Sequence, residues 1–265
     1  MSIEQITATP QNSPLSVSVL GVRVDRISQA QTLEQIEALL ARYRAAGGAI
    51  ACKQLVTVNT EFIMAAQRDE AFRAIINHAA LVVPDGMGVV WATRYLGRPA
   101  PERVTGTDTL VELAGLCARH SYRLYLLGAA PGVAEEAGRR LQERYPALEI
   151  AGSYAGSPAI EEEEGILERL RAANADVLCV AYGAPAQERW IARNLERLPV
   201  AVAMGVGGAY DFLSGRQRRA PRAMQRLGVE WLYRLYREPW RWRRMLALPR
   251  FAIVVILKGR GRQHA

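Results

Sequence analysis

Cysteine is scarce in this sequence, and no two cysteines have the spacing of a metal site or a redox motif. Only three of the 265 residues are cysteines, namely Cys52, Cys117 and Cys179, and they lie far apart in apolar surroundings. We predict that they are small buried hydrophobic side chains in a reducing compartment, and that they form no disulfide.

Long apolar runs are missing as well. The longest is FAIVVIL at 251–257, about a third of the roughly 20 residues that a membrane-spanning helix needs. The N-terminus shows no basic segment followed by an apolar run, which is the pattern of a signal peptide. We therefore predict a cytoplasmic protein that would meet a membrane from one side only.

Several signatures of catalysis are also absent. The sequence has no HExxH, no GxSxG and no DxD pair, the last being the usual arrangement for holding a metal against a nucleotide diphosphate. None of the three histidines follows a predicted strand. An enzyme that acts on a nucleotide sugar with this sequence would have to stabilise the leaving diphosphate with arginines, helix N-termini and backbone amides.

Acidic side chains are nearly missing from the last fifty residues. Residues 216–265 hold 14 Lys and Arg against two acids, whereas the preceding 215 residues hold 20 basic and 24 acidic side chains. The net charge of +8 therefore arises in the C-terminal segment. We predict a domain boundary near Arg216, and we predict that residues 1–16, which are polar and contain two prolines, are poorly ordered.

Apolar, β-rich runs alternate with amphipathic segments of helix length between residues 17 and 215. Strands that are apolar throughout and alternate with helices are typical of a parallel sheet covered on both faces. The predicted fold class is therefore α/β, with a Rossmann-like, mostly parallel sheet in 17–215 and a basic helical appendage in 216–265. One long helix is predicted over residues 61–79. The runs include QLVTVNT, ALVVPDG, YRLYLLGAA, LEIAGSYAG, DVLCVAYGA and VAVAMGVGG.

Polar residues and glycines follow the predicted strands, at the edge where ligands of such sheets bind. They are Thr57, Asn59, Asp85, Gly128, Gln187 and Asp211. Their convergence favours a binding pocket. For Asp85, two interpretations stay open: a carboxylate exposed on a tight strand-to-helix turn, or a cap of the helix that follows. Gly128 fits a phosphate-binding loop or a simple turn.

The segment from Gly228 to Ala265 combines arginines with tryptophans. Arg234, Arg237, Arg241 and Arg244 share one helical face if the helix continues, although Pro239 is expected to divide it. This composition suits the headgroup region of an anionic membrane, and it also suits single-stranded nucleic acid. A surface helix with solvated arginines is a third interpretation, which the excess of positive charge disfavours.

The ordered motifs resemble the WecG/TagA/CpsF glycosyltransferases, glycosyltransferase family 26, over about residues 20–250. One departure is Ala186, where the family usually has a lysine. The motifs that carry the resemblance are VTVNTEF, VPDGMGVVW, ERVTGTD, LYLLGAAPGVAEEA, AYGAPAQERWI, GVGGAYDFLSGRQRRAP and GVEWLYRLYREPWRWRR.

The resemblance implies an inverting enzyme that needs neither metal nor cofactor. Its substrates would be a UDP-sugar, which donates N-acetylmannosamine, its uronic acid or glucose, and a polyprenyl-diphosphate-linked saccharide, which accepts the sugar. Such enzymes build bacterial surface polysaccharides on the cytoplasmic leaflet of the inner membrane. The resemblance therefore implies a peripheral, monotopic enzyme that contacts anionic lipids; a homo-oligomer that hides the apolar stripe of the tail is left open.

The resemblance also implies roles for single residues. Asp85 matches the general base, which would deprotonate the acceptor hydroxyl, and Thr57, Asn59 and Arg103 match residues that line the catalytic pocket. The positions expected to bind substrate are Gly128, Gln187, Asp211, Arg234, Arg241 and Arg244, of which the three arginines match residues that contact diphosphate.

Two other classes of protein are weighed against this one. A non-catalytic α/β protein that binds nucleic acid would use the basic tail, but the body of the chain is acidic. A nucleotide-dependent oxidoreductase would need GxGxxG followed by an acidic ribose-binding residue, which the sequence lacks.

Overall fold

The computed structural model describes residues 15–221, 224, 230–237 and 247–258. Nearly all of the predicted disordered N-terminus lies outside the described residues, as do Arg241 and Arg244. Arg234 lies on a described helix, but its side chain is outside the described part. The domain boundary near Arg216 stays a prediction.

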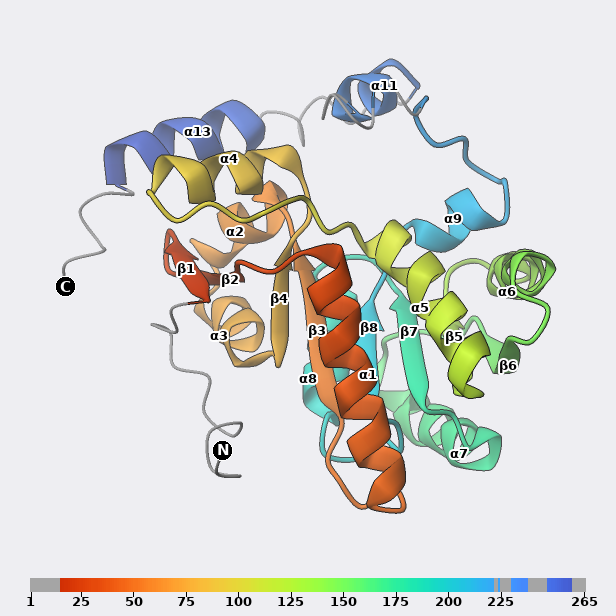
Figure 1. Ribbon diagram of the computed structural model, residues 1–265. Coiled ribbons are helices and arrows are strands. Elements are labelled where there is room, and N and C mark those ends of the chain that lie inside the picture. The colour runs from red at the N-terminus through yellow and green to blue at the C-terminus, as the bar shows by residue number, and fades with distance from the viewer. Residues whose placement is uncertain (1–14, 222–223, 225–229, 238–246, 259–265) are drawn as a thin grey trace.

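Six strands form the main sheet of the protein (Figure 1). They are β3 (Lys53–Val58), β4 (Leu81–Pro84), β5 (Arg123–Gly128), β6 (Glu149–Tyr154), β7 (Val177–Ala181) and β8 (Val202–Gly205). Their order is β4-β3-β8-β7-β5-β6, and every neighbouring pair is parallel. The apolar runs of the sequence are these strands, so the predicted α/β class with a mostly parallel sheet is confirmed.

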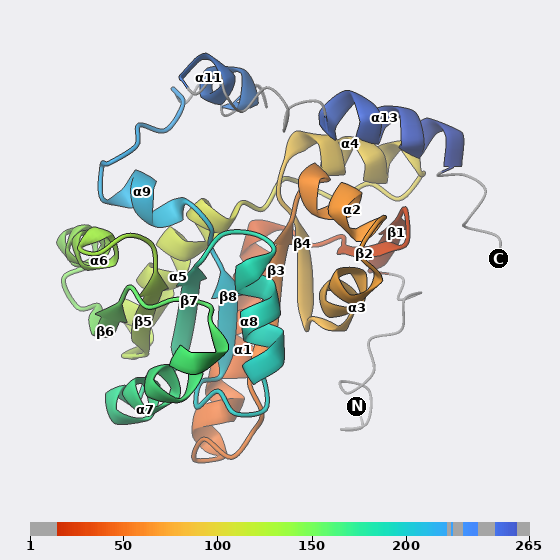
Figure 2. The same ribbon diagram turned by 180° about the vertical axis from the view of Figure 1, so that it is seen from behind.

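Helices cover both faces of the sheet, as Figures 1 and 2 show from opposite sides. One face carries α1 (Gln29–Ala45), α5 (Gly106–His120), α6 (Val133–Arg144) and α9 (Ala209–Leu213). The other face carries α7 (Glu163–Ala173), which follows a 3-10 turn at Ile160–Glu162, and α8 (Ala186–Asn194). Each layer has its own apolar core, centred on residues such as Leu113 and Trp190 that are fully buried. Burial of apolar side chains between the sheet and the helices on each face stabilises this three-layer arrangement.

A third apolar core lies beside β3 and β4. It joins an antiparallel hairpin, β1 (Ser16–Val19) and β2 (Val22–Asp25), to α2 (Thr60–Ala66), α3 (Glu70–His78) and α4 (Met87–Tyr95). The hairpin turns at Leu20 and Gly21, which have φ angles of 54° and 84°. Two consecutive residues with positive φ match the tight turn that joins twisted strands.

The long helix predicted over 61–79 is wrong, because the segment forms two helices. The first, α2, ends at Ala66, and α3 begins at Glu70. Asp69 is the N-cap of α3, and its side chain accepts a hydrogen bond of 2.9 Å from the backbone N–H of Phe72. A capping carboxylate offers the backbone an alternative to a continuous helix, which is why the apolar periodicity alone missed the break.

All three cysteines are buried and free, which confirms the prediction that they form no disulfide. Burial raises the pKa of the Cys52 and Cys117 thiols to about 12. Thiols with such pKa values stay protonated at neutral pH and are inert as nucleophiles.

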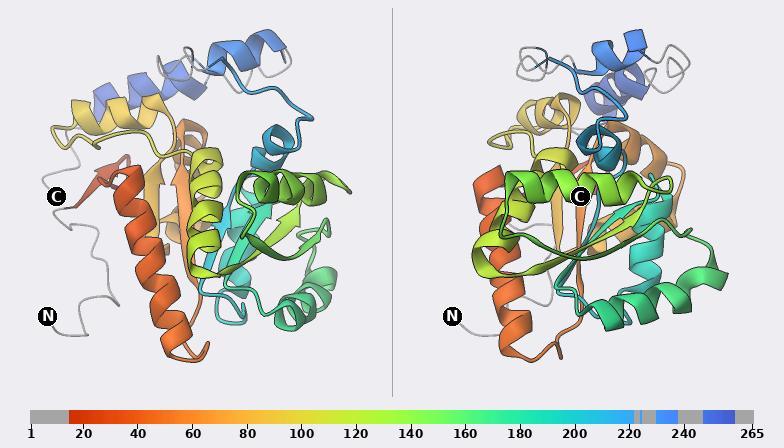
Figure 3. Two further views of the ribbon diagram at one scale, coloured as in Figure 1. Left: turned by 45° about the vertical axis from the view of Figure 1, so that its right-hand side comes forward. Right: turned by 90° about the vertical axis from the view of Figure 1, so that its right-hand side faces the viewer.

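Two described helices follow the α/β body: α11 (Glu230–Arg237) and α13 (Ala247–Lys258). Both lie beyond the carboxyl ends of the strands (Figures 1 and 3). The apolar run 251–257 is part of α13, which packs on α2 and α4 and buries Phe251 and Val255 in their core. In the described segments, no helix has the length and apolar character needed to cross a bilayer.

The strand order has one feature that bears on function. From β5 the chain passes through α6 to β6 on one side, whereas from β7 it passes through α8 to β8 on the other side. β5 and β7 are neighbours, so the connections diverge between them. A crevice opens at such a switch point beyond the carboxyl ends of the strands, and ligands of open α/β sheets bind there.

Candidate active site

Asp85 follows β4 on a tight turn and is half-buried. Its Oδ2 accepts a hydrogen bond of 3.3 Å from the backbone N–H of Gly106, the first residue of α5. Gly86 is the N-cap of α4, at a φ of 121°, and no side chain caps that helix. The interpretation of Asp85 as the cap of the following helix is therefore wrong. Its carboxylate instead faces the N-terminus of another helix, where partial positive charge favours an anion.

Gly106 brings three segments of the site together. A methyl group at Gly106 would lie 3.2 Å from Thr57 Oγ1 and 3.9 Å from the carbonyl oxygen of Gly205. Asp85, Thr57 and the end of β8 thus meet at the start of α5, as the sequence predicts for strand ends that share one edge. Asn59 lies nearby in sequence but caps α2, where its Oδ1 accepts a 3.0 Å hydrogen bond from the N–H of Phe62.

Arg103 belongs to a cluster of four charged side chains. Glu230, the first residue of α11, accepts from Arg103 at 3.3 Å and from Arg219 at 3.4 Å. Arg219 also makes a bidentate pair with Asp108, whose Oδ2 accepts a 2.7 Å hydrogen bond from Thr105 Oγ1. Burial acts to raise the pKa of Asp108, but the hydrogen bonds from Arg219 and Thr105 outweigh it and lower the pKa.

This cluster fastens α11 to the α/β body. The side chains of Arg103 and Glu230 are only 17% and 12% exposed, so their charge pair is less screened by solvent than a surface pair. The bidentate pair of Arg219 with Asp108 also fixes the relative orientation of the two side chains. Arg103 was predicted from the sequence but its partners were not, since pairing between residues 103, 219 and 230 leaves no local pattern.

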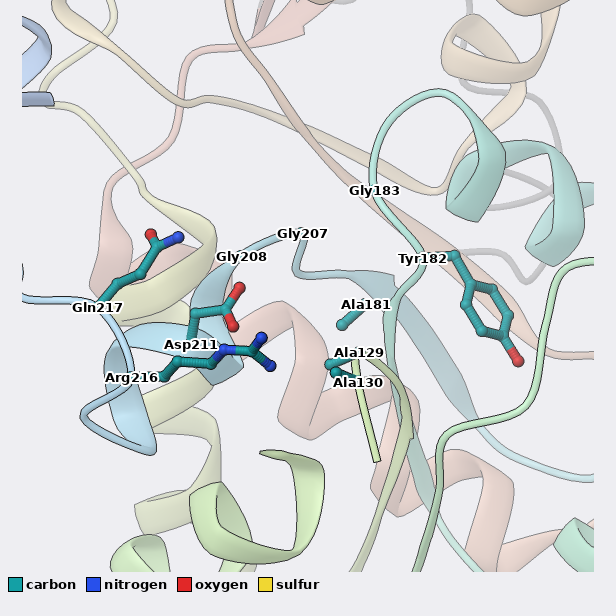
Figure 4. Close-up of a pocket in the computed structure, with 10 residues that line it drawn as sticks. All are labelled: Ala129, Ala130, Ala181, Tyr182, Gly183, Gly207, Gly208, Asp211, Arg216 and Gln217. Carbon is teal, nitrogen blue, oxygen red and sulfur yellow. The ribbon is translucent and has the colours of Figure 1, made fainter. Parts of the chain in front are cut away.

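A pocket of about 400 Å³ lies at the switch point between β5 and β7 (Figure 4). Small residues after the two strands and after β8 form one side of it, and the side chains of Asp211, Arg216 and Gln217 come from α9 and the segment that follows. Gly128 ends β5 immediately before the pocket loop. The remaining lining residues are Ala129, Ala130, Ala181, Tyr182, Gly183, Gly207 and Gly208.

Gln187 lies in the first turn of α8 and is 3% exposed. Its Oε1 accepts hydrogen bonds of 3.1 Å from the backbone N–H groups of Gly183 and Gly207, and both glycines line the pocket. The oxygen of this side chain thus binds the two pocket loops, while its Nε2 donates a 2.7 Å hydrogen bond to Glu188 Oε1. The role in substrate binding predicted for it stays a prediction.

Glu188 is a buried carboxyl group that the sequence analysis missed. It is 2% exposed, and burial raises its pKa to about 7, although a hydrogen bond from Gln187 acts in the opposite direction. No pattern in the sequence distinguishes it from the solvated glutamates on neighbouring helices. Only the packing of α8 on β3 and β8 reveals its burial.

We expect Glu188 to make the free energy of unfolding depend on pH. The folded protein keeps this proton up to about pH 7, whereas the unfolded chain releases it near pH 4.5. The contribution of Glu188 to the free energy of unfolding is therefore greatest below pH 4.5, and it falls by about 3 kcal/mol as the pH rises to 7. Urea unfolding at pH 5 and pH 8 would measure this change in the free energy of unfolding. The change should be smaller in Glu188→Gln than in wild type. An equal change in both proteins would contradict a raised pKa of Glu188.

The described residues contain no group of three or more His, Cys, Asp or Glu side chains placed to hold a metal ion. Arg216 lines the pocket, the N-terminus of α5 faces Asp85, and Arg103 and Arg219 lie in the charged cluster, where they pair with Glu230 and Asp108. Guanidinium groups and helix N-termini both bind phosphate oxygens. The site thus offers a carboxylate at the ends of β3 and β4, and a glycine-lined pocket with an arginine at the ends of β5, β7 and β8.

The chain is similar in sequence to known glycosyltransferases. A protein of Bacillus subtilis (strain 168), named N-acetylglucosaminyldiphosphoundecaprenol N-acetyl-beta-D-mannosaminyltransferase, is 36% identical over 200 residues, which cover 76% of this chain and 77% of the relative. A protein of the same name from Staphylococcus aureus (strain MW2) is 30% identical over 246 residues, or 93% of this chain and 94% of the relative. The model of the Glycosyl transferase WecG/TagA/CpsF family matches residues 17–265. The chain therefore belongs to the WecG/TagA/CpsF glycosyltransferase family and is a hexosyltransferase.

Proposed function

We propose that this enzyme transfers N-acetylmannosamine from UDP-N-acetylmannosamine to a polyprenyl-diphosphate-linked saccharide, with inversion and without a metal ion. The two relatives named for mannosaminyl transfer to N-acetylglucosaminyldiphosphoundecaprenol support both the sugar and the acceptor class. The uronic acid of N-acetylmannosamine and glucose are the alternative sugars.

The observation that carries the proposal is the position of Asp85. Its half-buried carboxylate lies at the edge of the sheet beside Thr57 and the start of α5, next to the glycine-lined pocket at the switch point. A carboxylate at such an edge can reach an acceptor, while the neighbouring crevice takes a nucleotide.

The chemistry follows from this arrangement. Asp85 takes the proton of the acceptor hydroxyl as that oxygen forms a bond to the anomeric carbon. The bond between the anomeric carbon and the diphosphate oxygen breaks on the opposite face, and its electron pair leaves with UDP. Arg216, which lines the pocket, would balance the charge that develops on the diphosphate, and Arg103 and Arg219 of the neighbouring charged cluster would assist it.

A donor panel tests this proposal. We expect UDP release from UDP-N-acetylmannosamine with a short-chain polyprenyl-diphosphate-linked N-acetylglucosamine as acceptor, unchanged by EDTA. Release should be at least tenfold slower from the uronic acid donor and from UDP-glucose, because a site built for one polar substituent leaves groups unpaired with another. Loss of UDP release in EDTA would contradict the proposed metal independence. Turnover restricted to a different donor would contradict the proposed sugar.

We further propose that α11 and α13 attach the enzyme to the cytoplasmic leaflet of an anionic inner membrane. Both helices lie on the side of the sheet where the site opens (Figure 3). They expose large apolar side chains that a monomer in water would not favour. On α11 and α13 these are Trp231 (38% exposed), Leu232 (44%), Tyr236 (82%), Ile253 (56%), Ile256 (50%) and Leu257 (76%).

Flotation with vesicles measures this attachment. We expect the pair of changes Ile253→Glu and Leu257→Glu to weaken binding to phosphatidylglycerol vesicles more than tenfold, since each apolar side chain removed from the interface costs about 1–2 kcal/mol. Ile160→Glu is the matched control, because Ile160 is 67% exposed and begins the turn that leads into α7, a helix well apart from α11 and α13 (Figure 1). Equal binding of all three proteins would rule out attachment through α13.

A further inference from the structure

Glu188 is the one glutamate of α8 and lies inside the protein, beside the pocket loops. Its Oε1 accepts a 2.7 Å hydrogen bond from Gln187 Nε2, whereas its Oε2 is buried and has no partner among the described residues. A buried carboxyl group with an unpaired oxygen costs free energy of folding, and an apolar side chain of similar size would cost less. The stability of the fold therefore gives no reason for a glutamate here.

The hydrogen bond to Glu188 determines which way the Gln187 amide points. The amide nitrogen faces the carboxyl group, so the carbonyl oxygen faces the N–H groups of Gly183 and Gly207. In the opposite orientation, the amide nitrogen would meet two N–H donors and would lose its acceptor in Glu188. The pair therefore favours a single orientation.

The end of β8 is shaped to hold this pair. A Cβ atom at Gly205 would overlap Gln187 Nε2 and would lie 2.5 Å from Glu188 Oε1. Gln54 on β3 donates a 3.2 Å hydrogen bond to the backbone carbonyl of Glu188, which fixes the first turn of α8 against the sheet. The two side chains thus fill the space that a side chain on β8 would otherwise occupy.

The Gln187 carbonyl holds together two loops that belong to different strands. Gly183 follows β7 and Gly207 follows β8, with φ angles of 76° and 51°, and both line the pocket. The distance between these loops sets the width of the pocket in which we place the nucleotide. Their glycine residues have no side chains to fix that distance, and Gln187 supplies the link.

We propose that Glu188 is a positioning residue for the nucleotide pocket, acting through Gln187 to hold the loops after β7 and β8 at the spacing that a nucleoside diphosphate needs. This inference rests on the proposed function, because it takes the ligand to be the nucleotide of the donor. It assigns a role to a side chain that does not itself line the pocket.

Two substitutions at position 188 separate this role from a purely structural one. Glu188→Leu removes the acceptor, and we expect the KM for the UDP-sugar and the Kd for UDP to rise about tenfold, a loss comparable to that of one hydrogen bond. We expect kcat to change less than threefold and the melting temperature to stay level or rise. Glu188→Gln keeps a carbonyl acceptor for Gln187, so it should restore KM to within about threefold of wild type.

A double substitution tests whether Glu188 acts through Gln187. Gln187→Leu should raise KM as well, and adding Glu188→Leu to it should cause no further rise, because the link is already broken. A tenfold rise in Glu188→Leu that multiplies with that of Gln187→Leu would contradict positioning through the amide. An unchanged KM in Glu188→Leu would overturn the proposal outright.

Amide hydrogen exchange provides a readout that needs no turnover. Glu188→Leu should speed exchange at the amides of Gly183 and Gly207 by roughly tenfold, and Glu188→Gln should not. If the wild-type protein releases no UDP from any donor, the proposed function is wrong. The exchange measurement would still show whether Glu188 holds the two loops together through Gln187. If the wild-type enzyme is active and exchange is unchanged in Glu188→Leu, the proposed link between the loops through Gln187 is wrong, whereas the proposed function is not affected.

Discussion

Asp85→Asn lowers kcat/KM for sugar transfer by about 10³-fold, if the carboxylate is the base that the proposed mechanism requires. Asparagine has the same shape and can still accept the hydrogen bond that Asp85 receives from the N–H of Gly106. It has no basic oxygen at neutral pH, so the acceptor hydroxyl keeps its proton. The initial rate of UDP release with saturating acceptor measures the effect.

Two further measurements show whether that loss is chemical. The Kd for UDP should change less than about twofold in Asp85→Asn, because the carboxylate acts on the acceptor and the variant alters only the bond-making step. Asp69→Asn is the matched control: Asp69 caps α3, pairs with Arg189 and does not line the pocket, and asparagine is an equally good cap. Wild-type turnover in Asp85→Asn, or an equal loss in Asp69→Asn, would remove Asp85 from the mechanism.

The local patterns of the sequence were enough to predict the strands of the main sheet. Runs such as DVLCVAYGA and YRLYLLGAA are apolar at every position of β7 and nearly every position of β5, because both faces of these strands are buried. Because the carboxyl ends of parallel strands lie at one edge of a sheet, the sequence also predicted that Thr57, Asp85 and Gly128 lie at the same edge. The prediction needed no knowledge of which strands are neighbours.

The order of the strands lay beyond these patterns. β3 pairs with β8, which is separated from it by almost the whole α/β body, and the switch point between β5 and β7 follows from that order. Apolar runs of similar composition can pair with one another in many orders. Packing of the whole sheet selects one of them, so the pocket at the switch point became visible only in the fold.

The electrostatic features of the site were hidden for the same reason. Glu230 was one acid in a basic segment, yet it pairs with Arg103 and Arg219 at the start of α11. Glu188 follows a glutamine in an ordinary helical pattern, yet it is the most consequential buried acid near the pocket. Charge pairs and desolvation depend on distances between remote segments, to which periodicity is blind.

Gly128→Ala is expected to be strongly destabilising, by about 4 kcal/mol. Gly128 has a φ of 96°, where a Cβ atom is strained, and that atom would lie 2.8 Å from the carbonyl carbon and 2.9 Å from the carbonyl oxygen of Ala181. Strain of this kind costs about 1–3 kcal/mol, and overpacking adds about 1–3 kcal/mol. The neighbouring atoms are backbone of the paired strand β7, so no side-chain rotation can relieve the contact.

Gly132→Ala separates the two costs. Gly132 has a similar φ of 82°, but a Cβ atom there would meet no atom of the described residues within 4 Å, so only the strain of about 1 kcal/mol remains. Urea unfolding should show the two variants about 3 kcal/mol apart, and equal destabilisation would mean that β5 and β7 can separate to admit a methyl group. Because Ala129, which follows Gly128, donates a 3.0 Å hydrogen bond to Ala181 and lines the pocket, that separation would also widen the nucleotide site. A lower affinity for UDP in folded Gly128→Ala, with unchanged affinity in Gly132→Ala, is therefore the second expected result, and it identifies Gly128 as a residue that shapes the pocket through the backbone.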